Sequence, residues 1–197
     1  MKIRGKFIVI EGIDQSGKMT QTMILTKQLI RQGYKVKSMS FPMYNTPVGK
    51  LIKRFLNKDD FLPRVSHMLL SANRWEFERI ISNELINNDF LICNRYFFSN
   101  IAYGLAHKLD KKWLENLDRG LPKPDITILI DIPISESSVR KTKSRDKYEK
   151  NKKFLRSVRN KYKLLAKTKK WFIVNGNKDK ASVSDDIWKI IKKANKI

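Results

Sequence analysis

Short apolar runs alternate along the chain with longer stretches in which apolar residues recur every three or four positions. The runs have the composition of strands buried on both faces, and the periodic stretches are typical of amphipathic helices. Strands are predicted at residues 7–10, 36–41, 90–93, 126–132 and 172–174. Helices are predicted at about 18–33, 48–55, 64–87, 98–107, 111–117, 154–165 and 183–191. This alternation predicts an α/β fold with a parallel sheet covered on both faces.

The longest predicted helix, at about 64–87, should pack one apolar side on the core. That side comprises Val65, Met68, Leu69, Ala72, Trp75 and Ile80. With 197 residues, the chain has the length of one domain, which we place at 1–197. Because no apolar stretch is long enough to cross a membrane and the first residues lack a secretory pattern, we expect a cytoplasmic protein without a membrane partner. Cys93, the single cysteine, is interpreted as a small buried strand residue.

The net charge of +23 is concentrated in one part of the chain. Residues 140–170 contain fifteen Lys and Arg against Asp146 and Glu149, so they supply +13 of it. Such a stretch can serve a polyphosphate, a nucleic-acid backbone or a solvated surface. Its aromatic residues suit packing positions better than a platform for stacked bases. We therefore favour a solvated surface and argue against a nucleic-acid partner.

The first predicted strand leads into the motif G-x-x-x-x-G-K, and a helical pattern follows it. This is the context of a P-loop, in which backbone N–H groups and a helix dipole hold a polyphosphate. A glycine-rich turn without function is the competing interpretation. Met19 stands where Ser or Thr normally offers a hydroxyl to Mg²⁺. The predicted ATP-binding segment is Gly12, Ile13, Asp14, Gln15, Ser16, Gly17, Lys18, Met19 and Thr20.

Further motifs accompany the P-loop in a fixed order. They are Glu11-Gly12-x-Asp14, Phe41-Pro42, S-A-N-R-W-E at 71–76, Arg95-Tyr96-x-x-Ser99-Asn100-x-x-Tyr103 and G-L-P-K-P-D at 120–125. With these motifs the chain resembles thymidylate kinases over nearly its whole length. The resemblance implies transfer of the γ-phosphoryl group of ATP to dTMP, with Mg²⁺ as cofactor, giving dTDP and ADP. It also implies a homodimer and a nucleoside monophosphate kinase fold, with a five-stranded parallel sheet, flanking helices and a lid at about 136–150.

The resemblance assigns an acceptor site. Its dTMP-binding residues are Asp14, Phe41, Pro42, Leu70, Arg74, Arg95, Ser99, Asn100 and Tyr103. Arg74 would hold the acceptor phosphate or the base edge, and Arg95 the phosphates being joined. Asn100 would bind the base, and Tyr103 would crowd the 2′ position against ribonucleotides. Salt-bridged arginines and a tyrosine that only packs in the core are the alternatives.

The predicted catalytic residues are Lys18, Arg95, Arg145, Arg140 and Asp14. Phosphoryl transfer needs cations around the migrating charge. Because Gln15 and Ser16 leave the P-loop without an arginine, the resemblance assigns this charge to the lid, with Arg145 first and Arg140 second. A solvated basic segment is the alternative interpretation of the lid.

Two departures from the family pattern concern the metal. Met19 removes a hydroxyl, and Asn94 replaces the usual Asp, which leaves Glu11 and Asp14 as predicted Mg²⁺ ligands. We expect an active but metal-sensitive kinase, with base selectivity loosened because Leu70 stands where an aromatic ring commonly stacks on thymine. A weak P-loop paralogue that binds nucleotide without efficient turnover, a kinase of broadened monophosphate specificity, and a nucleic-acid-binding module remain as alternatives.

Overall fold

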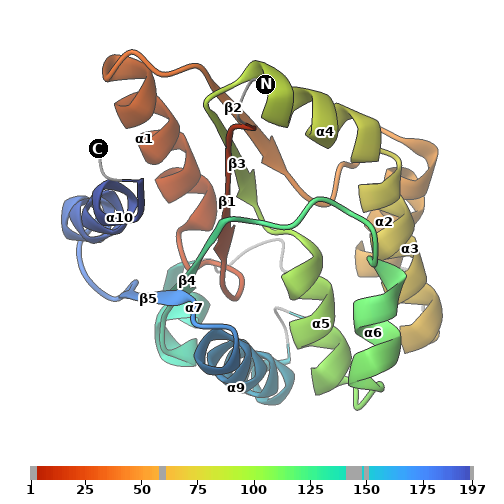
Figure 1. Ribbon diagram of the computed structural model, residues 1–197. Coiled ribbons are helices and arrows are strands. Elements are labelled where there is room, and N and C mark those ends of the chain that lie inside the picture. The colour runs from red at the N-terminus through yellow and green to blue at the C-terminus, as the bar shows by residue number, and fades with distance from the viewer. Residues whose placement is uncertain (1–3, 58–60, 141–147, 149–150, 196–197) are drawn as a thin grey trace.

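The computed structural model describes residues 4–57, 61–140, 148 and 151–195, and a five-stranded parallel sheet forms its centre (Figure 1). The strands are β1 (Lys6–Glu11), β2 (Val36–Ser40), β3 (Phe90–Asn94), β4 (Ile126–Asp131) and β5 (Phe172–Asn175). Their order in the sheet is β2-β3-β1-β4-β5, so β1 is central. All strands run parallel, and their carboxyl ends therefore meet at one edge. The predicted strands and the parallel sheet are confirmed.

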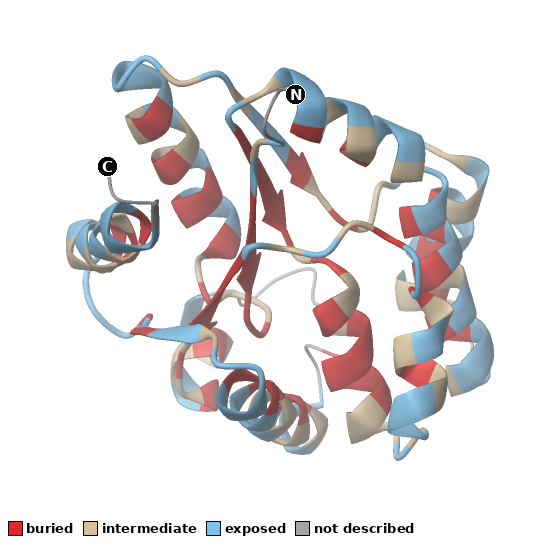
Figure 2. Cartoon of the chain, in the orientation of Figure 1, coloured by how far each residue is buried: buried red, intermediate tan, exposed pale blue. Residues whose placement is uncertain are grey.

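Helices cover both faces of the sheet. They are α1 (Lys18–Arg31), α2 (Pro47–Asn57), α3 (Pro63–Trp75), α4 (Glu78–Asn87), α5 (Phe97–Ala106), α6 (Lys111–Leu117), α7 (Ile134–Arg140), α9 (Lys152–Thr168) and α10 (Lys180–Asn195). Strand β1 is apolar from Phe7 to Ile10 because its alternate side chains point to opposite faces, both of which are covered. Ile8 and Ile10 pack towards α1 and α10, whereas Phe7 and Val9 pack towards α4. Figure 2 shows this buried sheet between the helices.

The prediction of one helix at 64–87 is wrong, because this stretch forms two helices, α3 and α4. The chain turns at Glu76 and Phe77, where the N–H of Phe77 donates to the carbonyl of Arg74 at 3.0 Å. A carboxylate oxygen of Glu76 accepts from Thr46 at 2.8 Å and from Asn73 at 2.9 Å. These side-chain bonds fix the turn to the loop before α2. The new direction lets α4 bury Ile81 and Leu85 against the sheet.

The predicted apolar side of α3 is also wrong. Val65, Met68, Ala72 and Trp75 are exposed, as is Ile80 of α4. The buried residues of α3 are instead polar: Ser66, His67, Ser71, Asn73 and Arg74. Periodicity located the helix but assigned its inner face to the wrong side, because these polar groups find hydrogen-bond partners inside the protein.

Two single-residue features complete the fold. The peptide bond between Phe41 and Pro42 is cis. Cys93 is fully buried in β3, as predicted, and burial raises the pKa of its thiol. No helix within the described residues combines the length and the apolar character that crossing a membrane requires.

Candidate active site

The loop between β1 and α1 requires glycine at two positions. Gly12 has a φ of 149° and Gly17 a φ of 92°, a region that side chains rarely adopt. A Cβ atom on Gly12 would lie 2.5 Å from the carbonyl oxygen of Ile130, so no larger residue fits there. Gly17 directly precedes the first residue of α1, Lys18, whose Nζ donates to the carbonyl of Ile13 at 2.6 Å. The predicted P-loop is therefore formed.

A cavity of about 480 Å³ lies over this loop at the carboxyl edge of the sheet. Residues Asp14 to Thr20 of the predicted ATP-binding segment line it, while Gly12 and Ile13 are buried beneath. The positively charged lining residues are Lys18, Arg95, Arg140, Lys178 and Lys180. Asp14 is the single carboxylate among the described lining residues. Such a surplus of positive charge suits a polyphosphate.

A second, smaller cavity of about 100 Å³ lies beside the first. Every residue predicted to bind dTMP lines it, namely Asp14, Phe41, Pro42, Leu70, Arg74, Arg95, Ser99, Asn100 and Tyr103. Its other lining residues, which the sequence interpretation did not place there, are Tyr44, Leu56, Tyr96 and Tyr148. Ligand pockets are usually about 300–1,000 Å³, so the walls must move before a nucleotide can enter.

Asp14 and Arg95 line both cavities and therefore mark where the two meet. A guanidinium nitrogen of Arg95 lies 2.6 Å from Asp14 Oδ1, and the hydroxyl of Tyr103 donates to Asp14 Oδ2 at 2.7 Å. Burial alone would raise the pKa of Asp14, but the charges of Arg95 and Lys18 and the Tyr103 bond lower it to about 2. This carboxylate is thus ionised at neutral pH.

A buried hydrogen-bond network supports Arg95 from below. Glu11 Oε2 accepts from Ser99 at 2.6 Å and from Tyr162 at 3.0 Å, and Glu11 Oε1 accepts from the N–H of Tyr96 at 2.9 Å. Arg95 in turn donates to Ser99 at 3.1 Å and to Tyr162 at 3.2 Å. Burial raises the pKa of Glu11. Because Glu11 lines neither cavity and both its oxygens are occupied, its geometry favours a supporting role over the predicted metal ligation.

Arg74 reaches the acceptor cavity from the buried face of α3 and is held by Asp118. Its Nε donates to Asp118 Oδ1 at 2.9 Å and its terminal nitrogen to Oδ2 at 2.7 Å, a bidentate pair. Both side chains are almost fully buried, with 4% and 3% exposed. Ser71 adds a 2.9 Å bond to Asp118 Oδ1. The guanidinium is therefore fixed in position before any ligand binds.

Asn100 is fixed by His67, a buried residue of α3. Nδ1 of His67 lies 2.5 Å from Asn100 Oδ1, and Asn100 Nδ2 donates to the carbonyl of His67 at 3.1 Å. Since an amide oxygen only accepts, Nδ1 carries the proton. Burial lowers the pKa of His67 to about 4, with smaller contributions from His107 and Arg74. No pattern could have revealed this pair, because its members lie 33 positions apart.

This buried histidine predicts an acid-sensitive stability. His67 has a pKa of about 4 in the fold against 6.5 for the free side chain, so the unfolded chain takes up the proton first. Stability is then complete above pH 6.5 and is lost as the pH falls towards 4. Between pH 7 and 4.5 the free energy of unfolding should fall by roughly 2 kcal/mol from this residue alone. Urea denaturation at a series of pH values gives the free energy of unfolding of wild type and of His67→Asn. This free energy should fall more steeply with decreasing pH in the wild type, and the same pH dependence in both proteins would contradict the prediction.

Arg140, the second choice for a lid cation, lies at the phosphate cavity. It donates to the carbonyl of Gln15 at 3.3 Å and to that of Gly176 at 2.9 Å. Ser137, on the same helix α7, donates to the carbonyl of Asp14 at 2.9 Å and ties this helix to the P-loop. Arg145, the first choice, lies outside the described residues, as does most of the predicted lid at 136–150. Arg140 is thus the lid residue that the structure places near the predicted phosphates.

Asn94, where the family pattern has Asp, faces the phosphate cavity from the end of β3. Its Nδ2 donates to Ser40 at 2.8 Å, but its buried Oδ1 has no partner among the described residues. An unpaired oxygen beside a phosphate site fits a hydrated Mg²⁺, which prefers oxygen ligands and keeps several waters. Within the described ranges no group of three or more His, Cys, Asp or Glu side chains forms a metal site.

A P-loop at the carboxyl edge of a five-stranded parallel sheet, joined to a second cavity by an Asp–Arg pair, defines a nucleotide-dependent phosphotransferase of the P-loop kinase class. A sequence model of the thymidylate kinase family matches residues 10–187. The chain is 33% identical to the thymidylate kinase of Plasmodium falciparum over 98% of its own length and 92% of that protein. It is 40% identical to the thymidylate kinase of Schizosaccharomyces pombe over 75% of its length and 70% of that protein.

The solved structure of the thymidylate kinase of Candida albicans superposes with a TM-score of 0.87, at 34% identity, over 98% of this chain and 93% of that one. The report of that structure describes broad substrate specificity for the Candida enzyme. This chain belongs to the thymidylate kinase family. The predicted kinase fold is confirmed.

Proposed function

We propose that this protein transfers the γ-phosphoryl group of ATP to dTMP, giving dTDP and ADP. The observation that carries the proposal is the junction of two cavities at Asp14 and Arg95. ATP in the phosphate cavity would place its γ-phosphate next to Arg95, where an acceptor phosphate in the second cavity would also lie. Holding both reactants at one point removes much of the entropic cost of the reaction.

Each charged residue has a separate task in this transfer. Lys18 would leave the carbonyl of Ile13 and bind the outer phosphates of ATP. Arg95, fixed by Asp14 and by the Glu11 network, would stabilise the charge that spreads over the migrating group. Arg140 would neutralise the phosphates from the side of α7. Asp14 keeps Arg95 in place, because its low pKa makes it a permanent negative charge.

On the acceptor side, the base would lie between Asn100 and Arg74. His67 leaves Asn100 one free amide hydrogen and one free lone pair, which can pair with the edge of a pyrimidine. Tyr103 crowds the sugar side, although its hydroxyl is bound to Asp14. Tyr148, which touches Tyr103 with ring centroids 5.4 Å apart, is a wall that has to shift when the cavity opens.

Steady-state turnover with ATP and a panel of dTMP, dUMP and dGMP tests this function. We expect kcat/KM to be highest for dTMP, with measurable turnover of other monophosphates, since Leu70 offers no ring to stack on the base. Purified Lys18→Met protein controls for contaminating kinases. Nucleotide binding without phosphoryl transfer at saturating Mg²⁺ would support the weak-paralogue alternative instead.

Mg²⁺ is the proposed cofactor, and it would neutralise the β- and γ-phosphate oxygens during transfer. Asn94 Oδ1 would contact it through water, with Thr20 near the same cavity. Because no carboxylate is free to bind it within the described part of the cavity, we expect its affinity to be low.

The double variant Met19→Ser, Asn94→Asp tests this metal site. It restores a hydroxyl and a carboxylate, so the Mg²⁺ concentration that half-saturates ATP binding should fall about tenfold, and activity should rise. Calorimetric ATP titrations across Mg²⁺ concentrations measure the binding directly, with Met19→Ser alone as the control. Unchanged metal dependence in the double variant, or saturation of the wild type at low Mg²⁺, would contradict it.

We also propose that the protein is a homodimer assembled through α3. Val65, Met68 and Trp75 lie on one side of this helix with 43%, 53% and 41% of their surface exposed, and Leu62 before it with 75%. Exposed apolar patches on soluble proteins often mark protein–protein interfaces. A second copy fits this stripe, because a two-fold axis brings one apolar surface against itself.

Replacing Met68 by Glu should yield monomers, because a charge would be buried in an apolar contact. Sedimentation equilibrium measures the mass. Met23→Glu is the matched control, since Met23 is equally exposed, at 54%, on the distant helix α1. Dimers that survive Met68→Glu, or dissociate with Met23→Glu, would locate the interface elsewhere. That the chain forms one domain and is cytoplasmic stays a prediction.

A further inference from the structure

A second large groove lies on the opposite edge of the sheet from the P-loop. Its volume is about 980 Å³, and it is lined where β4 and β5 begin, at Ile126 and Phe172. Parallel strands begin and end at opposite edges, so this site lies a full strand length from the phosphate cavity. Among the described residues it shares no lining residue with either cavity of the active site. Its size falls in the range of small-molecule pockets.

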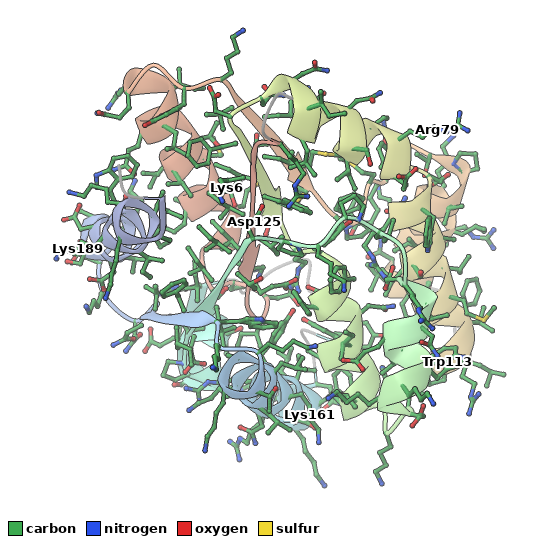
Figure 3. The ribbon with its side chains drawn as sticks, viewed as in Figure 1. Lys6, Arg79, Trp113, Asp125, Lys161 and Lys189 are labelled. Atoms are coloured by element: carbon green, nitrogen blue, oxygen red, sulfur yellow. The ribbon has the colours of Figure 1, made fainter. Side chains whose placement is uncertain are left out.

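The elements around this groove are far apart in the sequence. The segment between α6 and β4 passes in front of the sheet, and the end of α9 approaches it beside β5 (Figure 1). Figure 3 labels Asp125 where β4 starts, Trp113 on α6 and Lys161 on α9. Residues of β4, of the segment before it and of the stretch that follows α9 thus line one groove, and none of them lines a cavity of the active site.

One wall of the groove is aromatic. The rings of Phe98 and Trp171 lie 4.6 Å apart, and Phe97 is 4.3 Å from Phe98. Phe98 is almost fully buried, which anchors the wall, whereas Trp171 is half-buried and offers part of its ring to the opening. A rigid wall of aromatic rings suits a planar ring of a ligand.

The charges of the groove leave three cations without a carboxylate partner. Its carboxylates are all paired: Asp125 with Arg4 at 2.9 Å, Glu115 with Lys169 at 3.3 Å, and Asp118 with Arg74. In the described part of the chain, no ion pair involves Arg119, Lys123 or Lys170. All three are exposed at the rim. The groove therefore presents net positive charge beside an aromatic wall.

Lys170 occupies a backbone position that ordinarily selects glycine. It follows the end of α9 with a φ of 54°, and the next residue, Trp171, donates its N–H to the carbonyl of Ala166 at 2.9 Å. This is the hydrogen bond of a Schellman motif, in which glycine is usual. Lysine at such a position costs free energy relative to glycine. That side chain belongs to the groove.

We propose that this groove is a second binding site for a nucleoside polyphosphate, separate from the active site. The base would pack on the exposed part of Trp171, which Phe98 supports from behind, and the phosphates would lie among Arg119, Lys123 and Lys170. The inference does not depend on the proposed kinase reaction, because it uses none of the residues of the active site.

Equilibrium dialysis of labelled dTTP tests the site, with the active site saturated by ADP and dTMP. We expect about one further dTTP per chain to bind. Tripolyphosphate, which lacks the ring, and thymidine, which lacks the charge, should each bind at least tenfold more weakly. If tripolyphosphate bound as tightly as dTTP, surface charge alone would explain the binding. If thymidine bound as tightly as dTTP, the cations would contribute nothing. Either result, or no further binding, overturns the proposal.

Lys170→Gly separates binding from stability. It relieves the strained backbone, so its urea midpoint should equal or exceed that of the wild type, while dTTP affinity falls about tenfold through loss of one charged contact. Lys108→Gly is the matched control, since Lys108 also has a positive φ, of 62°, after a helix but lies outside the groove. Unchanged affinity in Lys170→Gly, or an equal loss in Lys108→Gly, would contradict the site.

Discussion

Replacing Arg95 by Gln should lower kcat about a thousandfold, because a cation at the migrating phosphoryl group stabilises mainly the transition state. The affinity for ATP should change little, since Lys18 and the P-loop backbone hold the outer phosphates. Arg95 is the natural first target, because it touches both cavities and the carboxylate of Asp14 at once. Pre-steady-state quench-flow measures the transfer step itself.

Arg95→Lys is the informative companion variant. Lysine keeps the charge but cannot bond Asp14, Ser99 and Tyr162 together, because it lacks the planar fork of arginine. We expect it to recover only part of the lost rate. Full recovery would mean that charge alone matters and that the supporting network is dispensable. If kcat of Arg95→Gln stayed within a few fold of the wild type, another residue would have to supply the catalytic charge.

Replacing Arg74 by Met should lower the free energy of unfolding by about 3–5 kcal/mol, since it leaves Asp118 buried without its counter-charge. The KM for dTMP should rise in the same variant, because Arg74 lines the acceptor cavity. The double variant Arg74→Met, Asp118→Leu removes both charges and should regain most of the stability but not the KM. Chemical denaturation and steady-state kinetics give the two readouts.

The pair of Arg159 and Asp131 is the matched control. It has the same bidentate geometry, at 2.6 Å and 2.8 Å, but its side chains are 27% and 16% exposed. Water and salt weaken such a pair, so Arg159→Met should cost about 1 kcal/mol or less. Equal losses in Arg74→Met and Arg159→Met would show that burial is not the source of the effect. A restored KM in the Arg74, Asp118 double variant would make Arg74 purely structural.

The fold could be predicted from the sequence because the patterns of strands and of the P-loop are local. Gly12 and Gly17 adopt positive φ values that other residues rarely adopt, and the apolar run of β1 is typical of a strand covered on both faces. The acceptor residues became recognisable through family motifs rather than through periodicity. All of them line the acceptor cavity, although their roles in binding remain predictions.

The inner face of α3 could not be predicted, because hydrophobic periodicity assumes that apolar residues face inwards. Here Ser71 and Arg74 are buried since Asp118, more than forty positions away, satisfies them. The role of His67 depends on Asn100 in the same way. The sequence predicts Glu11 to be a metal ligand. In the structure it accepts hydrogen bonds from Ser99 and Tyr162, which lie on two helices far away in the sequence. Long-range pairing of polar groups leaves no local signal.

The central position of β1 has a consequence for how the two halves of the active site fluctuate. Amides of a strand that is paired on both sides and packed on both faces exchange with solvent only when much of the protein unfolds. The P-loop directly follows this strand and is therefore held in place before ATP binds. Part of the wall of the acceptor cavity is formed by α3 and by Tyr148, which lie outside the sheet. A rigid donor half and an adaptable acceptor half would let one enzyme hold ATP in a constant pose while it fits different monophosphates.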